Sequence, residues 1–156
     1  MRRVATCIAG LAVLTVVGCI RDLPVTLPGI SSSEKSDEEQ IAAVLDDVQR
    51  GMQTRRIYKV IAYVSRNYHD ADGRDFAAVQ AYLSSIFKKY RSIKIERVPP
   101  TVAVQGNRAR AVETFGTNAQ PEDATVDPPI HLQGQVAVYF EKAGGAWQIV
   151  EWGNVQ

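Results

Sequence analysis

Two glutamates stand out as side chains that could do chemistry in an apolar setting. Glu113 lies in a stretch of alternating apolar residues, so it faces the protein interior if Ala111 and Phe115 do. The same alternation in the last apolar stretch of the chain predicts that Glu151 also faces the interior. Burial raises the pKa of a carboxyl group and prepares it for proton transfer. Glu113 and Glu151 are therefore candidate catalytic residues.

Arg97 supports a competing interpretation of the same interior. It follows Ile93 and Ile95 on one face of an alternating segment, so the alternation directs it inward with them. A guanidinium in that position would bind one or both glutamates as a structural ion pair and leave no free base. A further alternative is that the two glutamates lie at the solvent-exposed rim of the interior, and the sequence leaves these interpretations open.

Aromatic side chains near this interior could line a pocket for a small apolar ligand. Core packing is the alternative role for any one of them, because aromatic residues at helical or strand spacing are usually core residues. The predicted pocket residues are Tyr58, Tyr63, Tyr68, Arg97, Phe115 and Trp147.

The segment H-D-A-D-G at positions 69–73 has the acidic spacing of part of a calcium-binding loop. A complete loop of that type would begin at Tyr68, which carries no carboxylate, and would end at Val79 where a glutamate is needed. We therefore interpret the segment as a turn with capping carboxylates and expect no metal site. The sequence contains no P-loop, dinucleotide-binding glycine pattern or G-x-S-x-G motif, so we expect no cofactor.

Three helices are predicted to precede the strands that carry the glutamates. Ser36 begins an S-x-x-E capping box, followed by apolar residues at helical spacing. Thr54 could cap a second helix whose apolar stripe reaches Val64, and Asp75 could cap a third. The hydrophobic period then changes to two, which predicts four or five antiparallel strands and an α+β fold class. The predicted strands cover residues 93–96, 101–105, 108–116, 131–141 and 146–152, with a polar loop over 117–129.

The first residues predict export and attachment to a membrane. Arg2 and Arg3 precede an uncharged apolar run, which is the order found in a secretory signal. The residues V-V-G-C at positions 16–19 resemble a bacterial lipobox, and this resemblance implies cleavage after Gly18 and lipid on Cys19. The predicted division is a signal peptide over 1–18, the lipidated Cys19 with a flexible tether over 19–35, and a folded domain over 36–156. An uncleaved membrane anchor is the alternative, although the apolar run is short for a bilayer span.

These features place the protein in the cell envelope, held to a membrane by its N-terminal lipid. In a Gram-negative host, Ile20 after the cysteine would resemble an outer-membrane lipoprotein that faces the periplasm. The formal net charge is +1, and no basic run occurs beyond the first three residues. The composition therefore gives no sign of the basic surface that nucleic-acid binding requires, and we expect no nucleic-acid partner.

Three amphipathic helices leading into a curved antiparallel sheet resemble the nuclear transport factor 2-like superfamily, which includes ketosteroid isomerase and the SnoaL-like proteins. Two segments carry this resemblance: V-S-R-N-Y-H-D-A-D-G at 64–73, after the second helix, and A-W-Q-I-V at 146–150 in the last strand. The resemblance covers residues 36–154. It implies helices packed in the concave face of a cone-shaped sheet, an apolar pocket at the open end, and a homodimer formed through the outer sheet face.

Enzymes and non-catalytic binding proteins share this fold, so the resemblance alone leaves the function open. The leading expectation is a non-catalytic envelope lipoprotein that binds a small apolar ligand or a protein partner. One alternative is an enzyme of the ketosteroid isomerase or SnoaL-like type that uses Glu113 or Glu151 for acid-base chemistry. The catalytic motif of that enzyme matches no positions here, which makes an enzyme the less expected outcome. The other alternative is a structural dimerisation module.

Overall fold

A capping box opens the folded body at its first helix, α1 (Asp37–Gln53). The Ser36 hydroxyl accepts a hydrogen bond from the N–H of Glu39, and the Glu39 carboxylate accepts one from the N–H of Ser36. This reciprocal pair is the one that the sequence predicts. The computed structural model describes residues 35–154, so the predicted signal peptide, Cys19 and the tether up to residue 34 lie outside the described residues.

The second helix, α2 (Ile57–Ile61), is shorter than predicted and has a different start. Thr54 ends α1 instead of capping α2, because its N–H and its hydroxyl both donate to the Arg50 carbonyl. Val64 forms a bridge with Ile149 of the last strand and so lies outside the helix. Tertiary contact with the sheet therefore overrides the helical spacing of the apolar residues here.

The third helix, α3 (Phe76–Lys89), starts as predicted. The Asp75 carboxylate accepts a hydrogen bond from the N–H of Ala78 at 2.8 Å. Tyr90 ends α3 and begins the first strand, so the chain passes from helix to sheet without a loop.

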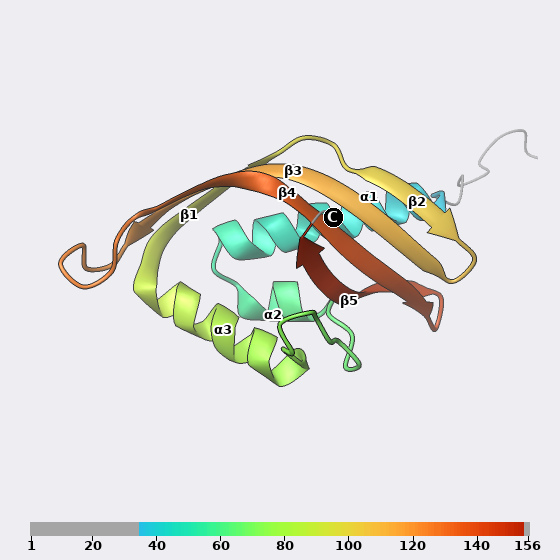
Figure 1. The fold of residues 1–156 in the computed structure, drawn as a ribbon, viewed down its shortest axis with the longest axis horizontal. Coiled ribbons are helices and arrows are strands. Elements are labelled where there is room, and N and C mark those ends of the chain that lie inside the picture. The colour runs from blue at the N-terminus through green and yellow to red at the C-terminus, as the bar shows by residue number, and fades with distance from the viewer. Residues whose placement is uncertain (1–34, 155–156) are drawn as a thin grey trace, which may run out of the picture. The chain divides into compact units, whose positions relative to one another are not determined.

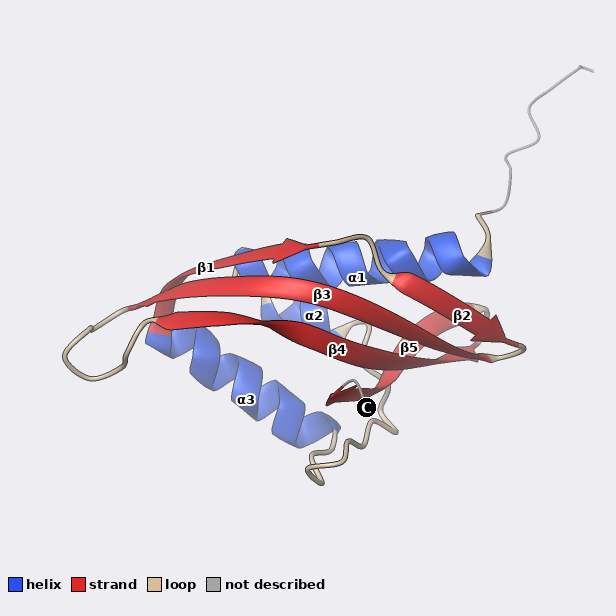
Figure 2. Cartoon of the chain, turned by 45° about the horizontal axis from the view of Figure 1, so that its top comes forward, coloured by secondary structure: helices blue, strands red, loops and turns tan. Residues whose placement is uncertain are grey.

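Five antiparallel strands form one sheet in the order β1-β3-β4-β5, and β2 also pairs with β3. The strand bounds are β1 (Tyr90–Arg97), β2 (Thr101–Gln105), β3 (Arg108–Pro121), β4 (Ile130–Ala143) and β5 (Ala146–Asn154). The sheet arches over the three helices, which lie on its concave side (Figures 1 and 2). This arrangement confirms the predicted α+β fold class. β3 continues to Pro121, past the predicted end at residue 116, because residues 117–121 pair with β1.

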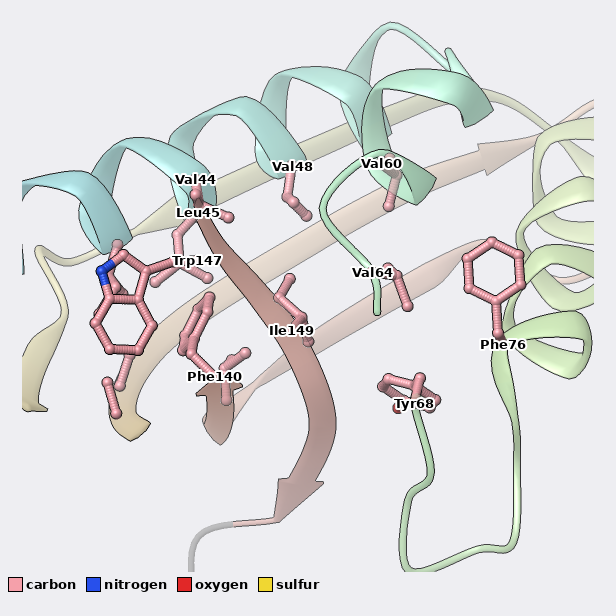
Figure 3. Packing of buried hydrophobic residues seen from close by; sticks show 14 of the residues in the cluster. Val44, Leu45, Val48, Val60, Val64, Tyr68, Phe76, Phe140, Trp147 and Ile149 are labelled. Carbon is pink, nitrogen blue, oxygen red and sulfur yellow. The ribbon is translucent and has the colours of Figure 1, made fainter. Parts of the chain in front are cut away.

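The main cluster of the hydrophobic core lies between the helices and the concave face of the sheet. The described residues, 35–154, belong to one compact unit. Figure 3 shows that this core is elongated: Trp147 and Phe140 lie at one end, and Tyr68 and Phe76 lie at the other. None of the helices within residues 35–154 has both the length and the apolar character needed to span a membrane.

Candidate ligand-binding site

An apolar pocket of about 380 Å³ lies between the helices and the concave face of the sheet. Its volume falls in the range of small-molecule binding sites. Helices α1, α2 and α3 and strands β1, β3, β4 and β5 all contribute to its wall. Much of the lining is hydrocarbon, from residues such as Val48, Val60, Val79, Leu83, Ile95 and Val136.

Three of the six predicted pocket residues line this pocket: Tyr68, Arg97 and Phe115. Tyr68 comes from the segment after α2, and the other two come from neighbouring strands whose register places Arg97 opposite Phe115. Alternation within β1 and β3 gives these two residues their inward direction, as the sequence predicts.

The other three predicted pocket residues lie elsewhere. Tyr58 is 84% exposed on the solvent side of the short helix α2, whose buried residue is Val60. Tyr63 follows α2, and its hydroxyl donates to the carboxylate of Asp47 on α1. Neither tyrosine lines the pocket.

Trp147 is buried in the core, beyond the lining of the pocket. Its indole N–H donates to the Asp37 carboxylate at 2.9 Å, at the start of α1. Figure 3 shows this residue at the end of the core away from Tyr68. The placement of Trp147 in the pocket was therefore wrong, because inward direction alone does not say which end of the core a residue reaches.

A β-bulge in β5 reverses the predicted inward direction of Glu151 and turns its neighbour Trp152 inward instead. Ile149 pairs with Phe140 and Glu151 pairs with Tyr139, so Val150 is an extra residue in the ladder. An extra residue shifts the alternation by one position. Trp152 consequently packs against the core and lines the pocket, whereas Glu151 does not line it. The prediction that Glu151 faces the interior with Glu113 was wrong.

Glu113 lies in the pocket wall, as its alternation predicts, and its carboxylate is paired. The residue is 5% exposed, and it accepts a hydrogen bond from the Arg97 guanidinium in a buried ion pair. The same guanidinium also binds Asp46, and its Nε donates to the Gln49 side-chain oxygen at 2.8 Å. Arg97 thus joins α1 to β1 and β3 through three acceptors, and this is the structural ion pair that the sequence offered as the alternative.

A second polar cluster, formed by Tyr68, Asp70 and Arg74, also lines the pocket. One oxygen of the buried Asp70 carboxylate accepts from the Tyr68 hydroxyl at 3.0 Å and from the Arg74 Nε at 2.8 Å. The other oxygen accepts the backbone N–H groups of Asp72 and Arg74. These bonds confirm the interpretation of residues 69–73 as a turn built on a carboxylate.

Hydrogen bonding fixes the charge state of this cluster. Burial acts to raise the pKa of Asp70, but the hydrogen bonds from Arg74 and Tyr68 outweigh it and hold that pKa below its usual value. Burial and the bond to Asp70 together raise the pKa of Tyr68 to about 12. At neutral pH, Asp70 is therefore ionised and Tyr68 is neutral.

Sequence reasoning missed Asp70, Arg74 and Trp152 as pocket residues. Asp70 and Arg74 lie in a segment that was interpreted only as a turn, and an arginine four residues after an aspartate was the available signal. Trp152 had no sequence signal, because nothing in the residues around Val150 predicts the bulge.

The two acidic residues that line the pocket, Asp70 and Glu113, are thus both held in ion pairs. A general base needs a carboxylate that is free to accept a proton from the substrate. Within residues 35–154, no group of three or more histidine, cysteine or acidic side chains is arranged to hold a metal ion. The geometry is that of an apolar cavity whose two lining carboxylates are neutralised in ion pairs.

Comparison with known proteins identifies the fold. No protein-family model matches the chain, and no curated protein sequence matches it. Solved structures do match: a nuclear transport factor 2-like superfamily protein from Salmonella enterica superimposes with a TM-score of 0.61 at 18% identity. That match covers 76% of this chain and 92% of the Salmonella protein.

Two further matches are to proteins described by their chemistry. A candidate scytalone dehydratase from Novosphingobium aromaticivorans has a TM-score of 0.65 at 14% identity, covering 72% of this chain and 78% of its own. A type 2 hexachlorocyclohexane dehydrochlorinase has a TM-score of 0.62 at 9% identity, covering 72% and 80%. The body therefore has the nuclear transport factor 2-like fold, as the sequence resemblance implied, and that fold accommodates both ligand-binding and enzymatic roles.

Proposed function

We propose that the body is a non-catalytic binding module for a small, uncharged, predominantly apolar molecule. The observation that carries this proposal is the apolar pocket of about 380 Å³ whose two lining carboxylates are both held in ion pairs. Burial of a ligand's apolar surface against such a wall contributes roughly 25 cal/mol per Å². The pocket thus offers a source of affinity but no free base for acid-base catalysis.

The charges around the pocket favour a neutral ligand. Arg97 is already bound by Glu113 and Asp46, and Arg74 is bound by Asp70 and Asp72. An anionic ligand would have to displace one of these carboxylates from its arginine. A cationic ligand would have to displace an arginine and leave a charge without its partner, which is costly in a buried site.

The two tryptophans of the chain allow a direct test of binding in the body (residues 34–156). Trp152 lines the pocket and Trp147 does not, so an uncharged apolar ligand that quenches only on contact, such as bromobenzene, should act on Trp152. We expect quenching of tryptophan emission to persist in Trp147→Phe and to fall at least fivefold in Trp152→Phe. Equal quenching in both variants would place the ligand elsewhere and contradict the proposal. The fluorescence of the uncharged dye N-phenylnaphthylamine gives a second measure of binding.

A matched pair of bulky substitutions tests the pocket itself. Thr117 lines the pocket from β3, whereas Thr101 is exposed at the start of β2. Thr117→Phe should fill part of the cavity and weaken dye binding at least tenfold, and Thr101→Phe should leave it unchanged. Native mass spectrometry of the body purified from its own host would then reveal a retained ligand, which Thr117→Phe should lack.

An acid-base enzyme is the second candidate function, and the position of Glu113 favours it. This carboxyl is 5% exposed in the wall of an apolar pocket, on a fold shared with a dehydrochlorinase. Chloride release from hexachlorocyclohexane gives a simple assay, in which we expect no release above a blank without protein. Release that is lost in Glu113→Gln and kept in Glu151→Gln would instead establish the enzyme.

We propose further that lipid on Cys19 anchors the body in the cell envelope, on the outer membrane if the host is Gram-negative. The support is the order of basic start, apolar run and lipobox in the sequence. Cys19→Ser should abolish incorporation of labelled palmitate and leave the unprocessed chain, whereas Cys7→Ser should leave both lipid attachment and processing intact. Palmitate labelling of Cys19→Ser at the wild-type level would contradict this proposal.

Dimerisation through the outer sheet face stays a prediction. Gln133 and Gln135 of β4 are exposed, whereas Trp152 of β5 lines the pocket. Light scattering of the body at high concentration measures the oligomeric state, and a monomer there would remove the structural dimer module from consideration.

A further inference from the structure

Strand β4 is longer than the strand that covers its edge. β4 pairs with β3 from Ile130 to Glu141, but β5 pairs with β4 only from Val136 onward. In the part of the chain that the structure describes, no strand pairs with residues 130–135 on the β5 side. Figures 1 and 2 show this part of β4 running on over α3 beyond the end of β5.

The direction of the backbone groups along this edge follows from one hydrogen bond. The N–H of Lys142 donates to the Asn107 carbonyl, on the β3 side of β4. Backbone groups alternate between the two edges of an antiparallel strand, and the β3–β4 register contains no shift. Even-numbered residues of β4 therefore bond to β3, and His131 and Gln133 direct their N–H and C=O groups to the open edge.

This open edge lacks the residue types that commonly block strand pairing. Natural edge strands are commonly blocked by proline, lysine or inward-pointing charges. Residues 130–135 read I-H-L-Q-G-Q and contain neither proline nor a lysine, arginine or acidic residue. Leu132 is 53% exposed. No residue type in this segment therefore opposes backbone pairing with another strand.

The open edge also adjoins the apolar pocket. Leu132 and Gly134 lie opposite Thr117 and Phe115, both of which line the pocket. A Cβ atom at Gly134 would lie 3.9 Å from the Phe115 ring, so this ring packs against the inner face of β4 and gives it an apolar surface at that point. A strand laid along the edge would direct every second side chain toward the pocket.

We propose that an extended peptide segment of a partner protein binds along residues 130–135 of β4 and places an apolar side chain in the pocket. Only a polypeptide backbone supplies donors and acceptors at the spacing of His131 and Gln133, so main-chain pairing selects a peptide. Six residues of strand span about 20 Å. The side chains that face outward would lie beside Gln133 and Gln135, which suits uncharged polar residues.

This inference goes beyond small-molecule binding, because it uses the backbone edge of β4 in addition to the pocket. The probe is a labelled six-residue peptide of alternating leucine and threonine with a Gly-Lys tail for solubility. Fluorescence anisotropy with the body (residues 34–156) measures its affinity. The N-phenylnaphthylamine assay, run in parallel, reports the pocket alone.

Two substitutions at one position separate the backbone from the side chain. Gln133→Pro removes the N–H that faces the open edge, and proline is tolerated at an edge position whose N–H is free. Gln133→Ala keeps the N–H and removes only the outward side chain. We expect Gln133→Pro to weaken peptide binding at least tenfold and Gln133→Ala to change it less than threefold, with dye binding unchanged in both.

Three results would overturn the proposal. The wild-type body could fail to bind the peptide, or Gln133→Pro could bind it as tightly as Gln133→Ala does. The body could also form a dimer that Gln133→Pro dissociates, in which case a second copy of the chain occupies the edge. A circular dichroism spectrum and an unfolding curve for each variant show that the fold is retained. If the wild-type body fails to bind the dye, the proposed small-molecule function is contradicted. The peptide proposal is then decided by the anisotropy measurements alone.

Discussion

The Arg97 guanidinium and the Glu113 carboxylate form an ion pair in the wall of the pocket, with side chains that are only 9% and 7% exposed. The pair joins β1 to β3 where these strands border the cavity, and Asp46 and Gln49 extend it to α1. One contact therefore holds the pocket wall together and occupies the carboxylate that could otherwise have acted as a base.

Removing the cation should destabilise the fold. Arg97→Met leaves the Glu113 carboxylate buried without its partner, which typically costs about 3–5 kcal/mol. Urea unfolding of the body measures the loss. Adding Glu113→Gln removes the unpaired charge, so the double variant should recover part of that loss. If Arg97→Met lowers the free energy of unfolding by less than about 1 kcal/mol, the ion pair contributes little to stability.

Acid should weaken the fold through Asp70. Hydrogen bonds from Arg74 and Tyr68 outweigh burial and hold the pKa of Asp70 below its unfolded value, which is about 3.9. A group with a lowered folded pKa contributes stability above its unfolded pKa, and this stability is lost as the pH falls through the folded pKa.

Urea unfolding between pH 7 and pH 3 tests this dependence on Asp70. Asp70→Asn should be less stable than the wild type at pH 7, and the difference should shrink as the pH falls below about 4. If the difference in unfolding free energy between Asp70→Asn and the wild type stays constant from pH 7 to pH 3, titration of Asp70 does not contribute to the pH dependence of stability.

Alkali should act on the same cluster through Tyr68. Burial and the bond to Asp70 raise the pKa of Tyr68 to about 12, from an ordinary value of 10.0. The raised folded pKa gives stability below pH 10 that is lost as the pH rises toward 12. Ultraviolet titration of tyrosinate should show a late component to which Tyr68 contributes together with Tyr63, whose pKa is also raised by its hydrogen bond to Asp47. Tyr68→Phe should reduce that component, whereas Tyr58→Phe, at an exposed position, should leave it unchanged. A late component of full size in Tyr68→Phe would contradict the assignment.

Gly51 allows α1 and α2 to approach closely. A Cβ atom at this position would lie 2.8 Å from Val60 Cγ2. Gly51→Ala should therefore destabilise the fold by overpacking, at about 1–3 kcal/mol, although alanine is favoured over glycine within a helix by about 1 kcal/mol. Val60→Ala removes that contact, while Lys59 Cβ at 3.1 Å and Val60 N at 3.3 Å stay close to the added atom. The cost of Gly51→Ala should therefore be smaller in the Val60→Ala background than in the wild type. Thermal or urea unfolding of the four proteins measures this difference, and an equal cost in both backgrounds would contradict it.

Local patterns predicted the parts of the structure that depend on neighbouring residues. Ser36 and Asp75 cap helices because their side chains bond to backbone groups three residues away. Alternation along β1 and β3 correctly directed Arg97 and Glu113 toward the same interior. These are effects of short range, so the sequence around each residue contains the information that decides them.

The tertiary structure alone decided which residues share the pocket. The bulge at Val150 turned Trp152 inward and removed Glu151 from the site, because one extra residue reverses the alternation in the rest of the strand. The elongated core separated Trp147 from Tyr68, although both are buried. The sequence determined the elements and the faces of most strands, whereas the order of contacts along the core depends on long-range packing that no local pattern encodes.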